Sequence, residues 1–191
     1  MSEISVRDRI RERREKGVDP EAFLQEVGAI EDIGGEELGF TRDFEKRVKA
    51  QLNSLKGSVG VQDIVQLFDI PQEYVEPQRE PYPAYKVIHT IHKWPSDAAL
   101  RFDIATDRAL HETTDLWDEV PARQRPRIVH ALRSFQDRCY FCDGELVYSD
   151  KPVESCCDEY LVITLSCEGC ERRFIEFNAD PSRPEQVARG E

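Results

Sequence analysis

The feature that most constrains this chain is a pair of identical cysteine motifs near its C-terminus. The first motif contains Cys139 and Cys142, and the second contains Cys167 and Cys170. Two thiolates at this spacing lie one tight turn apart, so both sulfurs can reach one metal ion at about 2.3 Å. The 24 residues between the motifs suffice for a long hairpin that brings the four thiolates together. We therefore predict a structural four-cysteine metal site, with disulfides or a thioredoxin-like redox pair as the alternatives.

The residues around the two motifs have the alternating pattern of a small sheet. The predicted strands are residues 145–148, 160–166 and 172–177. Gly144 and Gly169 are expected to supply the positive φ that turns backbone N–H groups toward sulfur. The order of motifs and strands over residues 138–178 resembles a zinc-ribbon domain. The resemblance implies a structural Zn²⁺ held by all four cysteines, with no coordination position left for a reacting water.

Two further cysteines, Cys156 and Cys157, lie between the motifs. Adjacent residues of an extended chain point to opposite faces, so at most one of the two can join the cluster. We predict a buried thiol or a thiol at the tip of a hairpin. A redox-responsive thiol or a substitute ligand is the alternative.

The rest of the chain shows mostly helical periodicity. Asp19 followed by Pro20 indicates one helix start, and Thr41 indicates another. Further helices are predicted at residues 61–68, 96–110 and from Pro121 to 135. Residues 84–94 fit either a strand or a short helix. A DNA-reading helix-turn-helix at residues 41–68 is the alternative to an ordinary helical hairpin. We predict an α+β fold, with a mainly helical N-terminal and central region before a C-terminal three-stranded antiparallel zinc ribbon.

Changes in composition divide the chain into four predicted parts. They are a charged helical arm with an acidic linker (1–38), a mainly helical domain with a Pro-rich linker at 71–84 (39–137), the zinc ribbon (138–178) and a flexible tail (179–191).

The charge of the chain is strongly acidic, with a formal net charge of −12. Only 7 of its 26 basic residues are lysines. Excess carboxylate with scarce lysine resembles the proteins of halophiles. At about 1 M salt the Debye length falls to about 3 Å, so the net charge excludes no class of partner.

One stretch beside the first cysteine motif is basic despite this acidic background. Residues 122–138 carry a net charge of +4. The arginines are Arg123, Arg125, Arg127, Arg133 and Arg138. We expect them to lie largely off the buried stripe of their helix and to bind an anionic partner. A solvated helix face with no partner is the alternative.

These observations favour a non-enzymatic zinc-binding protein. We expect a regulatory or accessory factor that docks on nucleic acid or a nucleoprotein machine through the arginine-rich helix, with Tyr140 and Phe141 as stacking surface. The alternative is a protein–protein adaptor or assembly module that uses the N-terminal arm and the ribbon. A third interpretation is an enzyme whose reaction uses the histidines. The four histidines are His89, His92, His111 and His130. The chain has no long apolar run and no apolar leader, so we expect a cytoplasmic protein with no membrane partner. The chain also lacks the common catalytic and phosphate-binding motifs, so we do not expect a small-molecule substrate.

Overall fold

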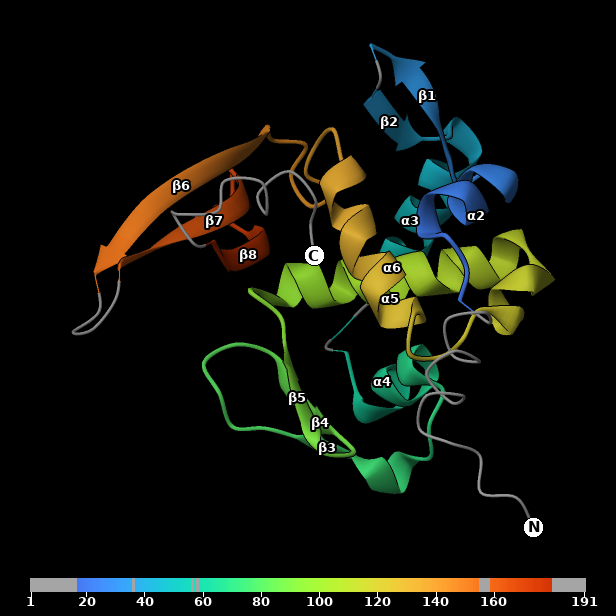
Figure 1. Cartoon of the computed structure of the whole chain (residues 1–191), viewed down its shortest axis with the longest axis horizontal. Helices are drawn as coiled ribbons and strands as arrows, with labels where there is room; N and C mark the ends of the chain where they lie inside the picture. The colour runs from blue at the N-terminus through green and yellow to red at the C-terminus, as the bar shows by residue number, and fades with distance from the viewer. Residues whose placement is uncertain (1–16, 36, 56, 58, 155–158, 180–191) are drawn as a thin grey trace, which may run out of the picture.

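The computed structural model describes residues 17–35, 37–55, 57, 59–154 and 159–179. Helices pack around one long central helix, and three small antiparallel sheets surround them (Figure 1). The predicted α+β fold class is confirmed. The predictions for residues 1–16, for Cys156 and Cys157, and for residues 180–191 fall outside the described residues. Within the described part, no helix combines the length and the hydropathy needed to cross a bilayer.

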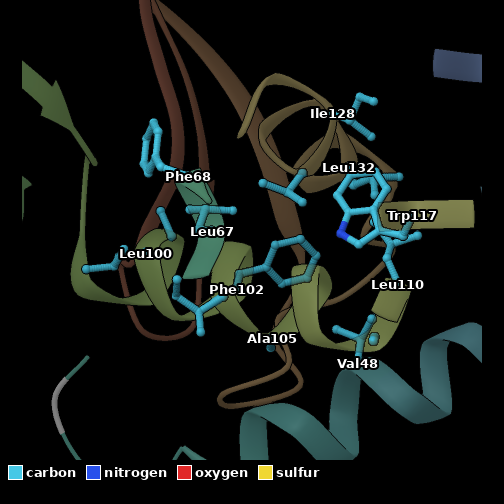
Figure 2. Close-up of a cluster of buried hydrophobic side chains, with 14 of the residues drawn as sticks. Val48, Leu67, Phe68, Leu100, Phe102, Ala105, Leu110, Trp117, Ile128 and Leu132 are labelled. Atoms are coloured by element: carbon cyan, nitrogen blue, oxygen red, sulfur yellow. The ribbon is translucent and has the colours of Figure 1, made fainter. Parts of the chain in front are cut away.

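The central helix is α5, Asp97–Thr113, and it supplies much of the core. Its first turn is capped by Ser96, whose hydroxyl accepts the N–H of Ala99 at 3.1 Å. Apolar side chains of α5 meet side chains from the helices around it (Figure 2). These helices are α3 (Arg42–Ser54), α4 (Val61–Phe68), η2 (Asp115–Glu119), α6 (Arg125–Ala131) and η3 (Leu132–Phe135).

The N-terminal part of the described chain joins this core. Asp19 caps α2, Pro20–Glu26, as predicted. The predicted acidic linker over residues 31–38 is wrong, because most of it forms a hairpin of β1, Ile30–Gly34, and β2, Glu37–Phe40. Glu31, Asp32 and Glu37 of this hairpin are exposed, so its sequence has the charge expected of a linker. Buried side chains before and at the base of the hairpin belong to the main core; they are Phe23, Leu24, Ala29 and Ile30.

The predicted Pro-rich linker also contains regular structure. It includes the 3-10 helix η1, Gln72–Tyr74, and the strand β3, Val75–Pro77. The following segment, which fitted a strand or a helix, is a hairpin of β4, Ala84–Val87, and β5, Thr90–Lys93. The three strands form one sheet in the order β3-β4-β5.

The predicted helix from Pro121 begins four residues later. Residues 121–124 form a turn in which the N–H of Gln124 donates to the carbonyl of Pro121 at 2.7 Å. The Gln124 side chain then bonds both backbone groups of Val18, at 3.1 and 3.2 Å. This pair of hydrogen bonds ties the start of the described chain to the start of α6.

The C-terminal sheet contains β6 (Leu146–Glu154), β7 (Glu159–Cys167) and β8 (Arg173–Ala179) in that order. The paired positions of β6 and β7 run from Leu146 opposite Cys167 to Glu154 opposite Glu159. The expectation of a three-stranded antiparallel sheet with a long hairpin is therefore confirmed.

A buried ion pair attaches this sheet to the helical body. Arg133 on η3 binds the Asp103 carboxylate on α5 through two nitrogens, and it also donates to the carbonyl of Phe174 on β8 at 2.9 Å. The indole N–H of Trp94 donates to the same carboxylate at 2.8 Å. The hydroxyl of Ser96 donates to the carbonyl of Arg173. The Asp103–Arg133 ion pair therefore joins α5 and η3, and Arg133 connects both to β8.

Candidate metal centre

The two cysteine motifs form loops with the same backbone geometry. In the first loop, the N–H of Asp143 donates to the carbonyl of Cys139 at 2.7 Å; in the second, the N–H of Glu171 donates to the carbonyl of Cys167 at 2.8 Å. In each loop the N–H of the first cysteine bonds a carbonyl five residues later, at 3.0 Å in both cases. Matching turns of this kind hold two pairs of sulfurs facing one another.

The four cysteine sulfurs come together at one point. The Sγ atoms of Cys139 and Cys170 lie 3.7 Å apart, and those of Cys142 and Cys167 lie 3.4 Å apart. All four sulfurs lie within 4.8 Å of one another. Sulfurs at 2.3 Å from a tetrahedral ion would be about 3.8 Å apart, close to these separations. The four cysteines can therefore hold one metal ion, and no other such group of His, Cys, Asp or Glu ligands occurs among the described residues.

The two glycines of the motifs act differently from the prediction. The positive φ angles belong to Asp143 and Glu171, at 59° and 57°, and not to Gly144 or Gly169. A Cβ on Gly144 would lie 2.8 Å from the Cys167 sulfur and 3.2 Å from the Cys142 sulfur. The glycine is therefore needed because the backbone approaches sulfur too closely for any side chain.

Aromatic residues between the first two cysteines pack inward. Tyr140 stacks on Phe102 of α5 at 5.9 Å between ring centroids, and Phe141 stacks on Phe174 of β8 at 6.2 Å. The expectation that both rings offer a stacking surface to nucleic acid does not fit these contacts. The stacks instead fix the first loop between the central helix and the C-terminal sheet.

The electrostatic environment of the sulfurs is uneven. Burial raises the pKa of the Cys139 thiol to about 12. Burial also acts to raise the pKa of Cys170, but hydrogen bonds from the backbone and side chain of Arg172 outweigh it and lower this pKa to about 6. Binding of a cation requires thiolates, so metal uptake at neutral pH releases the Cys139 proton.

Two cations offset the negative charge that four thiolates create. The guanidinium carbons of Arg172 and Arg101 lie 5.3 and 5.5 Å from the centroid of the Phe141 ring. Both arginines therefore lie next to the first cysteine loop. Four thiolates around a divalent ion leave a net charge of −2, which these guanidinium groups partly neutralise.

The five arginines predicted to face a partner divide into two groups. Arg125 and Arg133 are buried, at 5% and 2% exposure. Arg125 donates to the carbonyls of Val120 and Asp118, at 3.0 and 2.8 Å, and Arg133 binds Asp103. The expectation that the arginines lie largely off the buried stripe is wrong for these two residues. Arg123, Arg127 and Arg138 are exposed.

The histidines do not gather at one site. His89 and His130 are exposed, and His92 packs edge-on against Phe68 at 4.5 Å. His111 lies between two carboxylates, 3.7 Å from Asp107 and 3.3 Å from Asp118.

A cavity of about 510 Å³ lies beside the sulfur cluster, between α3 and the first cysteine loop. The residues of α3 that line it are Glu45, Lys49, Leu52 and Asn53. The loop contributes residues 137–143, including the exposed Cys142. The sequence carried no direct signal for this cavity, because α3 and the loop are far apart along the chain.

Two regions of the chain match domains of one family. Residues 19–134 match the central domain of a family of unknown function, DUF8054, and residues 137–177 match its C-terminal domain. The second match contains all four clustered cysteines. No curated protein and no solved structure matches the chain.

Proposed function

The chain belongs to the DUF8054 family, and we propose that it is a zinc-stabilised docking module for other proteins, without an enzymatic reaction of its own. The observation that carries the proposal is the closed set of four converging cysteine sulfurs, backed by two matching backbone loops. This site lies where the C-terminal sheet meets the helical body.

Zinc is the ion that best suits this donor set. Four thiolates at tetrahedral separations are the usual ligands of structural Zn²⁺, and soft sulfur donors disfavour Mg²⁺ and Ca²⁺. The order of the loops and strands resembles that of a zinc ribbon, which supports this choice of ion. Four protein ligands fill the coordination sphere, so the ion stabilises the fold and activates no water.

The burial of two arginines supports a protein partner over nucleic acid. Arg125 and Arg133 bond backbone and carboxylate groups of their own chain, so their charges are not available to phosphates. Three exposed arginines remain of the five: Arg123, Arg127 and Arg138. In a chain of net charge −12, three arginines give a weak electrostatic footprint for a nucleic acid.

Nucleic-acid docking is the second candidate, because these three arginines are exposed and Arg138 directly precedes the first cysteine. A triple variant with Arg123, Arg127 and Arg138 changed to Ala tests it against a matched control that removes Arg79, Lys86 and Lys93 from the β3-β5 region. Fluorescence anisotropy with labelled single- and double-stranded DNA and RNA is measured at several salt concentrations. Salt-dependent binding that the first variant loses and the control retains would favour nucleic acid and contradict the protein-docking proposal.

The metal is tested by elemental analysis of the purified protein. We expect one zinc per chain in the wild type and none in Cys142→Ser. Cys156→Ser and Cys157→Ser are the matched controls and should keep the zinc. A chain that carries no metal while its thiols are reduced would contradict the zinc proposal.

The docking role is tested by recovery of partners from the native host at native salt. We expect a specific protein to co-purify with the zinc-loaded wild type and to be lost from Cys142→Ser. Purified partner and purified chain should then form a complex in analytical ultracentrifugation. Failure of every recovered protein to bind in this purified system would overturn the docking proposal.

A further inference from the structure

We propose that the cavity between α3 and the first cysteine loop is the docking site for a cationic side chain, lysine or arginine, of a partner protein. The inference rests on the proposed docking function and adds the chemistry that the partner must present. It assigns a binding role to a cavity that shares Cys139 and Cys142 with the metal centre and extends from there to α3.

The cavity has the size of a ligand-binding site and a mixed apolar and charged wall. Its volume of about 510 Å³ falls within the range of roughly 300–1,000 Å³ that is usual for ligand sites. The aromatic rings of Tyr140 and Phe141, the aliphatic Leu52 and the amide of Asn53 line it together with five charged residues. A long side chain with an apolar stem and a charged end suits such walls.

The charges that line the cavity favour a cation. The charged side chains that line the cavity are three carboxylates, Glu45, Asp137 and Asp143, and two basic groups, Lys49 and Arg138. Lys49 is paired with Glu45 at 2.7 Å, and Arg138 lies 3.6 Å from Asp143 in an exposed pair. Asp137 forms no ion pair with any described residue. An incoming cation would therefore find one unpaired carboxylate and one weakly paired carboxylate.

The metal centre adds negative charge to the same cavity. Four thiolates around Zn²⁺ carry a net charge of −2, and the exposed Cys142 is part of the cavity wall. The arginines that partly offset this charge, Arg101 and Arg172, lie on the Phe141 ring and do not line the cavity. Three carboxylates against two basic groups in the wall, with the thiolates beside them, favour a cation over a phosphate in the cavity.

A lysine of the chain itself already makes the interaction that we infer. The Lys49 ammonium lies 5.1 Å from the centroid of the Tyr140 ring while it pairs with Glu45. Burial, and after it the nearby Glu45 carboxylate, raise the pKa of this tyrosine. An aromatic face beside a carboxylate is a favourable place for an ammonium or guanidinium group.

The test uses short blocked peptides and the zinc-loaded full chain. The probes are acetyl-Gly-Arg-Gly-amide and acetyl-Gly-Lys-Gly-amide, and acetyl-Gly-Gln-Gly-amide is the neutral control. Two-dimensional ¹⁵N NMR follows the titration. We expect the two cationic peptides to shift amides of residues 45–53 and 137–143, and the neutral peptide to shift none of them.

A pair of charge-matched variants separates a specific site from general attraction to an acidic chain. Asp137→Asn with Asp143→Asn removes two carboxylates from the cavity, and asparagine tolerates the positive φ of residue 143. Glu31→Gln with Glu37→Gln removes two exposed carboxylates from the β1-β2 hairpin. We expect the first pair to weaken binding of the arginine peptide about tenfold and the second pair to leave it within about twofold.

The outcomes distinguish this inference from the docking proposal. Equal weakening by both pairs of variants, or shifts spread over the whole chain, would overturn the cavity site. Shifts of residues 137–143 by a tetranucleotide and not by the cationic peptides would overturn it as well. If a purified partner binds wild type and Asp137→Asn with Asp143→Asn equally, docking stands and the cavity is not its site. Zinc analysis and circular dichroism of each variant verify that it is folded.

Discussion

At the scale of single residues, the metal centre depends on the absence of a side chain at Gly144 as well as on its four cysteines. Gly144 has an ordinary φ, so the backbone conformation itself does not require glycine. The requirement is spatial, because the backbone passes two sulfurs and the N–H of Gly169 with no room for a methyl group. This requirement follows only from the meeting of the two loops.

Replacing Gly144 by alanine should therefore weaken metal binding. The added Cβ at 2.8 Å from the Cys167 sulfur must displace a ligand or a loop, at a cost of about 1–3 kcal/mol in stability. Competition with a zinc-binding dye should show an affinity at least about tenfold lower. Gly57→Ala is the matched control, since a Cβ there meets no atom within 4 Å. Equal affinities for the two variants would contradict the crowding argument.

Another residue with a specific energetic role is Asp107, a carboxylate on α5 with 2% exposure. Burial raises the pKa of this carboxyl, opposed in part by the hydrogen bond from Trp117 and by the charges of His111 and Arg125. An acid whose pKa is higher in the folded state stabilises the fold when protonated. That contribution is full below the unfolded pKa of about 3.9 and is lost as pH rises through the folded value.

The free energy of unfolding of Asp107→Asn should therefore increase relative to that of wild type as pH rises. Asparagine keeps an acceptor for the Trp117 indole, which lies 3.0 Å from the carboxylate, and it cannot ionise. Urea unfolding of both proteins between about pH 4 and 7 measures the difference in the free energy of unfolding. Asp115→Asn, at an exposed position of η2, is the control. A difference between Asp107→Asn and wild type that stays constant over this range would contradict the prediction.

At the scale of elements, the β4-β5 hairpin joins its strands through an unfavourable turn. Val87 pairs with Thr90, so Ile88 and His89 alone form the loop. Ile88 has a φ of 58°, a conformation that β-branched residues rarely adopt. Sequence patterning identified only an ambiguous apolar segment here, since the usual Asn-Gly or Gly signal of a tight hairpin is missing.

Ile88→Asn should stabilise the chain by about 1 kcal/mol, because asparagine adopts positive φ at lower cost. Ile91→Asn is a closely matched control: both isoleucines are 48% exposed, but Ile91 lies on β5 with strand geometry. The control should be slightly destabilising, since asparagine disfavours strands. Thermal unfolding of both variants measures the change in stability. Equal destabilisation by Ile88→Asn and Ile91→Asn would contradict backbone strain at Ile88.

At the scale of the whole molecule, two sites hold the C-terminal sheet in place together with the aromatic stacks on Phe102 and Phe174. One is the metal centre, which joins both cysteine loops. The other is the group around Asp103, where Arg133 and Trp94 meet β8. The main core around α5 includes Trp94 as well as the fully buried Trp117.

Removal of the metal should therefore unfold the C-terminal sheet before the helical body. A tight chelator under reducing conditions should reduce strand content in circular dichroism and produce a separate, lower transition on heating. The fluorescence of Trp117 should change only in the upper transition. Trp94→Phe isolates this signal but removes one hydrogen bond to Asp103, so this variant with metal is the reference for the same variant without it. A single transition that also changes the Trp117 emission would contradict the prediction.

The amino-acid sequence by itself determined the features that depend on neighbours along the chain. The helix caps Asp19 and Thr41, the apolar stripe of α3 and the spacing of the cysteine pairs are local patterns, so they predicted elements and a shared cluster correctly. Only the tertiary structure decided which charges are buried. Arg133 meets Asp103 across 30 residues and Phe174 across 41. A sequence pattern shows that an arginine is present but not which distant carboxylate will neutralise it, because that depends on how the packed elements meet.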